Sequence, residues 1–86
     1  MIKREDHPVG WAMLNYELAD AHEHLGNLLK HLAEDPEYSE ESFRVELGHV
    51  YAHLNRAWYQ RNAPHELPQS EWEAASRYPS DLDPVG

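Results

Sequence analysis

The chain contains no cysteine, few basic residues and no long apolar run, and each of these absences excludes a class of protein. Without cysteine it forms no disulfide and carries no thiolate nucleophile or cysteine-based zinc site. The 7 lysines and arginines against 16 aspartates and glutamates give a formal net charge of −9. Because a nucleic-acid backbone is bound by clustered cations, we expect no nucleic-acid partner.

Neither membrane insertion nor secretion is indicated. A membrane-spanning helix needs about 20 predominantly apolar residues in succession, and no stretch of the chain approaches that length. The opening residues, MIKREDHPVG, lack the apolar run of a signal peptide. We therefore expect a soluble, cytoplasmic protein with no membrane partner.

The sequence offers little support for catalysis. It has no glycine-rich phosphate loop and no nucleotide-binding fingerprint. Three serines that could serve as nucleophiles, Ser39, Ser42 and Ser70, are better explained as residues that cap helices. We therefore favour a non-enzymatic protein with no catalytic residue and no cofactor.

The first strong pattern is an apolar stripe between residues 8 and 34. Its members recur at alternating steps of three and four, as on one face of a helix: Trp11, Leu14, Leu18, Ala21, Leu25, Leu28 and Leu32. Pro8 suits a first turn, where a missing N–H costs little. Asp35 precedes Pro36, and a residue in that position avoids the helical region. The pattern predicts one helix over about 8–34.

A second stripe with the same steps predicts a helix over about 40–62. Its apolar members are Phe43, Leu47, Val50, Leu54 and Ala57. Ser39 is the expected cap, and Ala63 followed by Pro64 ends the element. The intervening loop, 35–39, is short, so the two helices should form an antiparallel hairpin.

A shorter element is expected near the C-terminus. Ser70 and Glu73 stand three residues apart, as the two partners of a capping box do. This spacing predicts a short helix over about 71–77, followed by a frayed tail over 79–86. The whole chain, residues 1–86, is then one small all-α domain.

One hairpin leaves much of its apolar surface uncovered. Helices of about 24 residues are about 36 Å long, and each buries only the face that meets the other. Isolated hairpins of this size rarely bury enough apolar surface to offset the entropy that the chain loses on folding. We therefore expect two chains to pair with two-fold symmetry into a four-helix bundle.

This architecture favours a small acidic interaction protein that acts as a homodimer and has no enzymatic activity. Such a protein needs a surface for a protein partner, and tryptophans are common anchors at interfaces. The predicted docking patch consists of Trp11, Trp58 and Trp72. The sequence does not identify the partner.

The 7 histidines of the chain raise a second hypothesis, a metal site. The conspicuous pair in the stretch AHEH, His22 and His24, is not a chelate, because successive helical residues turn by about 100° and these side chains point about 160° apart. His24 instead shares a face with Asp20. On the second helix, His49 and His53 stand four residues apart and share a face as well.

These two histidine-bearing faces should meet across the hairpin. With the loop centred near residues 37–39, facing residues have numbers that sum to about 76. His24 and His53 sum to 77, and so do His31 and Glu46. The predicted ligands of a transition metal such as zinc or iron are therefore His24, His53, His49, Glu46 and Asp20. A metal-binding or metal-dependent redox protein is the alternative function.

Overall fold

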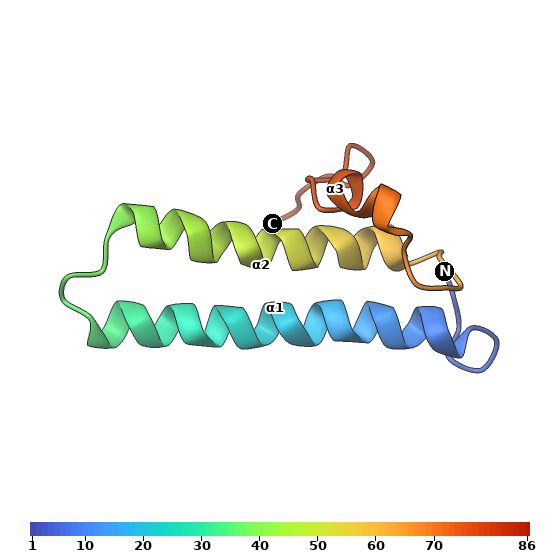
Figure 1. The fold of residues 1–86 in the computed structure, drawn as a ribbon, viewed down its shortest axis with the longest axis horizontal. Helices are drawn as coiled ribbons and strands as arrows, with labels where there is room; N and C mark the ends of the chain where they lie inside the picture. Colours follow the sequence, from blue (N-terminus) through green and yellow to red (C-terminus); the bar gives the residue numbers. More distant parts are fainter.

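The computed structural model describes all 86 residues, which form helices and connecting segments but no strand. Helix α1 spans Pro8–Glu34, α2 spans Glu40–Gln60, and a 3-10 turn, η1 (Gln69–Glu71), leads into α3 (Trp72–Ala75). Figure 1 shows α1 and α2 side by side and antiparallel, with α3 on the side of α2 that faces away from α1. The predicted all-α hairpin with a short C-terminal helix is confirmed. None of the helices combines the length and apolar character needed to traverse a bilayer.

Both ends of α1 follow from the prolines beside them. Pro8 fills the first turn, and the preceding residue, His7, makes no side-chain bond to the helix. The His7 Nδ1 lies 3.5 Å from the backbone nitrogen of Lys3, which donates to it. At the other end Asp35 is extended, with φ −108° and ψ 103°. A residue before proline prefers this conformation, so the helix stops at Glu34.

The ends of α2 are fixed by two polar side chains. Ser39 caps the helix as predicted, because its Oγ accepts the N–H of Ser42 at 3.1 Å. The helix ends at Gln60, earlier than the predicted residue 62. The buried Gln60 amide donates to the carbonyls of Ala63 at 2.9 Å and His65 at 2.8 Å. These two bonds hold the chain in a turn, so the helix does not continue.

The C-terminal helix is shorter than the predicted range of 71–77. Helix α3 has only 4 residues, and η1 begins before Ser70, so this serine lies inside a turn and does not precede a helix. No side chain caps either element, and the predicted capping box of Ser70 and Glu73 is wrong. Ser76 ends α3, and its Oγ donates to the Trp72 carbonyl at 2.7 Å.

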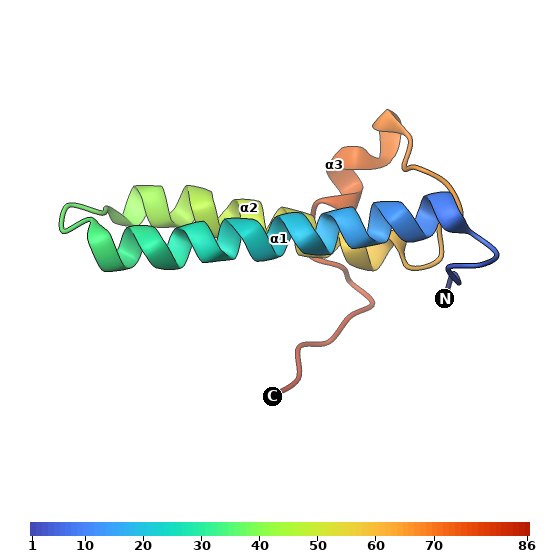
Figure 2. The same cartoon turned by 90° about the horizontal axis from the view of Figure 1, so that it is seen from below.

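The tail beyond α3 is partly anchored, although the sequence predicts a frayed end. Asp81 accepts a hydrogen bond from Trp58 Nε1 at 2.9 Å and one from Arg61 Nη2 at 3.1 Å. The Trp58 bond and the Arg61 charge hold the pKa of Asp81 below its ordinary value. Figure 2 shows the tail leaving the hairpin on the side opposite to α3.

The contact between the long helices uses only half of the predicted apolar stripes. The buried members recur every seven residues and are Leu14, Ala21 and Leu28 in α1, and Val50 and Ala57 in α2. Trp11 and Leu47 are half-buried, and the other members are exposed, because each helix has only one long neighbour. We use the name apolar flank for the exposed residues Leu18, Leu25, Leu32, Phe43, Tyr51 and Leu54.

The N-terminal segment closes the open end of the hairpin. The backbone N–H of Ile2 donates to the carbonyl of Arg61 at 2.8 Å. The Ile2 side chain is buried with Leu14 and Ala57, and Trp11 packs against this cluster. Residues from the start of the chain, α1 and α2 therefore share one small core.

Candidate metal centre

Histidines and carboxylates occupy the flank of the hairpin opposite to the apolar flank. Adjacent helical residues point about 100° apart, so His24 and Leu25 lie on different flanks of α1. Across the hairpin, His31 Nδ1 lies 2.8 Å from Glu46 Oε1. The two residue numbers sum to 77, so the register expected from the short loop is confirmed.

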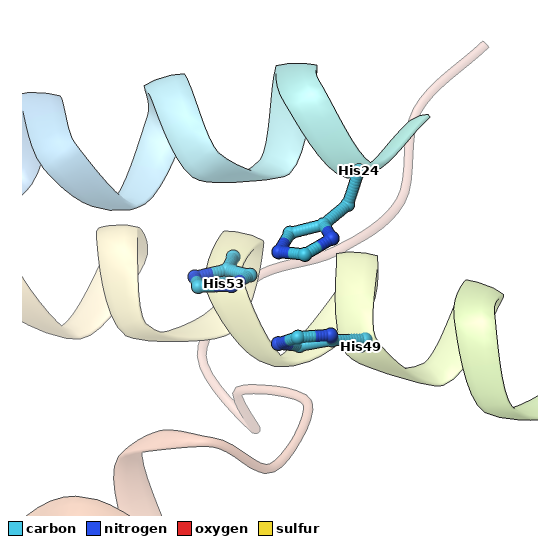
Figure 3. Close-up of side chains that lie close together, drawn as sticks. All are labelled: His24, His49 and His53. Carbon is cyan, nitrogen blue, oxygen red and sulfur yellow. The ribbon is translucent and has the colours of Figure 1, made fainter. Parts of the chain in front are cut away.

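Three histidines gather on this flank, near the middle of the hairpin. Figure 3 shows His24 of α1 reaching toward His49 and His53 of α2. Each offers one ring nitrogen, and these three atoms lie within 4.8 Å of one another. The ring centroids are 4.1 Å apart for His24 and His49, 4.8 Å for His49 and His53, and 5.2 Å for His24 and His53. The site is therefore built by both long helices.

His53 is the most constrained member of the cluster. His53 is only 7% exposed, and its Nδ1 lies 3.0 Å from Glu17 Oε2. An ionised carboxylate can only accept, so this contact places the proton of the neutral ring on Nδ1. The other nitrogen, Nε2, is then a lone-pair donor, and it is buried without a hydrogen-bond partner. This is the arrangement of a metal-binding histidine whose ring is oriented by a carboxylate.

Glu17 is itself held by Arg56. The Arg56 Nε lies 3.1 and 3.2 Å from the two carboxylate oxygens of Glu17. Arg56 also donates through Nη1 to Ser76 Oγ at 2.7 Å, and its guanidinium lies 4.2 Å from the ring centroid of Trp72. Its Nη2 is 3.2 Å from His53 Nδ1, but Nδ1 cannot accept that N–H while it donates to Glu17. The network thus fixes the imidazole from the side of α3.

The surroundings of His49 favour its neutral form. Partial desolvation lowers the pKa of His49 below its ordinary value, and the positive forms of His24, His53 and Arg56 lower it further. Asp20 acts in the opposite direction. A ring with a lowered pKa is neutral at pH 7, and metal binding requires the neutral form.

The cluster has the donor set for a transition metal but not yet its geometry. Zinc–imidazole bonds of about 2.0–2.1 Å place nitrogen ligands about 3.3 Å apart in a tetrahedron. His53 stacks on His24 and on His49, with interplanar angles of 15° and 26°, and His24 is tilted by 37° against His49. Since a nitrogen lone pair lies in the plane of its ring, the side chains must rotate for all three to point at one ion. The exposed His49 and half-buried His24 have the room to do so.

The two predicted carboxylate ligands are not part of this cluster. Asp20 is exposed and reaches the site only through its charge on His49. Glu46 bonds to His31 through Oε1, while its Oε2 is buried. The Tyr38 hydroxyl lies beside this carboxylate, and burial, the Glu46 charge and a hydrogen bond to Glu46 raise the pKa of Tyr38.

The three tryptophans are each occupied by groups of the same chain. Trp11 packs against the small core, and Trp58 donates to Asp81 beneath the guanidinium of Arg61, which lies 3.8 Å from its ring centroid. Trp72 stays 40% exposed with Arg56 over its ring. A tryptophan docking patch for a protein partner stays a prediction.

Sequence reasoning missed the support that Glu17 and Arg56 give to the site. A glutamate seven residues before His24 lies on the same helical face, which is a usable signal. Arg56 carried no such signal, because its burial depends on how α3 docks. Comparisons with known protein families, with characterised proteins and with solved structures found no match.

Proposed function

We propose that this protein binds one transition-metal ion through His24, His49 and His53. The observation that carries the proposal is the convergence of three imidazole nitrogens within 4.8 Å, contributed by both long helices. Three neutral nitrogen donors suit zinc, copper, nickel or iron, whereas magnesium and calcium prefer oxygen ligands. The metal-binding alternative from the sequence is therefore better supported by the geometry than a partner-docking role.

The buried nitrogen of His53 separates this proposal from the view that the histidines are ordinary polar residues. A polar side chain on a helix flank normally finds a hydrogen-bond partner or reaches water. His53 Nε2 has neither, and a buried group left in this state costs about 1–3 kcal/mol. A metal ion at the cluster would use this lone pair, and Glu17 would orient the ring behind it.

The test is metal binding by protein that carries no histidine tag. After chelator treatment, isothermal titration with zinc, nickel, copper and cobalt should give one equivalent bound, with a rise in melting temperature. His24→Ala and the double variant with His53→Ala should abolish both effects. His22→Ala is the matched control. Because His22 points to another side of α1, this variant should bind metal as the wild type does. Less than about a tenth of an equivalent of any of these metals, with no thermal shift, would refute the proposal.

A second proposal concerns assembly, and the exposed apolar flank favours it. Leu18, Leu25 and Leu32 repeat every seven residues along α1 and are exposed, beside Tyr51 and Leu54 of α2. A regular apolar row of this length is typical of a helix that packs against another helix. We propose that two copies pair through this flank into a four-helix bundle, which leaves both histidine clusters on the outer surface.

The assembly proposal is tested by the absolute mass in solution. Multi-angle light scattering should give the mass of a dimer, and Leu25→Glu should give a monomer that still binds metal. Tyr16→Glu is the matched control, because Tyr16 is also exposed but lies about 200° around the helix from the buried Leu14. A well-folded wild-type monomer at micromolar concentration would contradict the dimer.

A further inference from the structure

A cavity adjoins the histidine cluster at His24 and His49, on the side of the hairpin loop. It has a volume of about 180 Å³ and is lined by His24, Asn27, His31, Val45, Glu46 and His49. One water molecule occupies about 30 Å³ in the liquid, so the cavity has room for several waters or a small ligand. Two of the three proposed metal ligands, His24 and His49, form part of its wall.

The chain supplies no fourth metal ligand at this cluster. His24, His49 and His53 are the one group of three or more such residues whose ligand atoms lie within 4.8 Å of one another. Glu17 is already bonded to His53 and Arg56, and Glu46 to His31 at 2.8 Å. Structural zinc sites are closed by four protein ligands, whereas sites with three protein ligands keep a position for water or substrate.

We infer that the metal ion held by His24, His49 and His53 keeps one exchangeable coordination position, which faces this cavity and takes water or a small monodentate ligand. The inference rests on the metal binding proposed above. The water or small ligand at this position can be replaced while the three histidines keep the metal ion bound.

The polar wall of the cavity supports this inference. Glu46 lines the cavity, and the Tyr38 hydroxyl is a donor beside its carboxylate. A carboxylate can also accept from a water, and a water bound to a metal is a stronger donor than a free water because the ion withdraws charge from it. Asn27 offers a further amide on the same wall. The cavity is therefore polar enough to hold an ordered water beside the ion.

The test uses cobalt(II) as the metal and azide as the probe. Cobalt has visible absorption bands that respond to its ligands, so the spectrum reports what occupies the fourth position. Azide added to the cobalt-loaded protein should change the spectrum with saturation at one azide per cobalt. The cobalt should still elute with the protein on gel filtration.

Two variants locate the open position. Glu46→Gln should bind cobalt with the affinity of the wild type and still respond to azide, because Glu46 is a neighbour of the ion and not its ligand. Asn27→Phe should retain cobalt but lose at least tenfold in azide affinity, because the ring fills the cavity. Asn15→Phe places the same ring on another side of α1 and should leave azide binding unchanged.

Each outcome separates this inference from the proposed metal binding. If cobalt binds but azide leaves the spectrum unchanged, or removes the cobalt, the open position is refuted and the metal site stands. If Glu46→Gln weakens cobalt binding at least tenfold, Glu46 is the fourth ligand and the site is closed. If no cobalt binds to the wild type, both proposals fail.

Discussion

Glu17→Gln is the substitution whose effect on stability follows most directly from the structure. The side chain of Glu17 is 14% exposed and that of Arg56 is 7% exposed, so the ion pair between them is largely shielded from water. The same carboxylate accepts from His53 Nδ1 at 3.0 Å. Glutamine keeps the size of the side chain and one acceptor oxygen, but it removes the charge that both partners face.

The expected loss is about 3 kcal/mol of the free energy of unfolding. Unit charges 3.1 Å apart attract each other by about 5 kcal/mol at an effective dielectric constant of about 20. Removing one partner of a buried pair costs about 3–5 kcal/mol, because the other charge stays buried. The oxygen that glutamine retains offsets part of that cost for Arg56. For a domain of this size the melting temperature should fall by about 12–24 °C.

Urea unfolding followed by far-ultraviolet circular dichroism, on metal-free protein at pH 7, measures this loss. Glu73→Gln is the control, since Glu73 and Arg77 also pair but are 86% and 74% exposed, and it should cost no more than about 0.5 kcal/mol. The double variant Glu17→Leu with Arg56→Met should be more stable than Glu17→Gln, because no buried charge is left unpaired. Equal losses for Glu17→Gln and Glu73→Gln would show that the pair is not buried in solution.

Three further predictions concern metal affinity, glycines and pH. Calorimetry on Glu17→Gln should show metal affinity reduced by about 10- to 100-fold, because the carboxylate no longer orients the ligand behind it. In the same unfolding assay, Gly10→Ala should destabilise the protein by about 1–3 kcal/mol, since the added methyl group would overlap the backbone that follows α2. At Gly26 and Gly48 an added methyl group has no neighbouring atom within 4 Å. Gly26→Ala and Gly48→Ala should therefore stabilise the protein by about 0.5–1 kcal/mol, because alanine favours a helix more than glycine does. Because the pKa of His49 is lower in the folded protein than in the unfolded chain, the unfolded chain binds this proton more readily as the pH falls. The stability of the metal-free protein should therefore fall as the pH drops below 6.5. Unfolding curves recorded at several pH values should show a weaker pH dependence for His49→Gln.

The register of the hairpin was predictable because it depends on few residues. Pro36 and Ser39 fix where the chain turns, and residues that face each other then follow from their numbers. The pairing of His31 with Glu46 at 2.8 Å confirms this. The closeness of His24 and His53, with ring centroids 5.2 Å apart, has the same origin.

The surroundings of the cluster were less predictable, because they depend on the C-terminal segment. That segment has no strong apolar period, so nothing in the sequence indicated that Ser76 would receive hydrogen bonds from Asn55 at 2.7 Å and Arg56 at 2.7 Å. Burying Arg56 in turn selects Glu17 as its partner. Such choices are made by tertiary packing, which a helical period does not encode.

The partial exposure of the apolar stripe of α1 was predictable, because a hairpin gives each helix only one long neighbour, but the sequence does not say which members are buried. Leu14 and Leu18 belong to one pattern in the sequence, but only Leu14 is buried. A period of three and four residues says which positions share a broad face. It does not say how many neighbours will cover that face.

The contact between Ile2 and Arg61 has a consequence for the order in which the chain folds. The entropy lost on closing a loop grows with the length of the chain between its ends. Near the turn, His31 and Glu46 close a short loop, whereas Ile2 and Arg61 enclose nearly the whole hairpin. Helix pairing should therefore start beside the turn and proceed toward the open end. The backbone amide of Ile2 should be among the last to become protected from hydrogen exchange, and among the first to lose that protection.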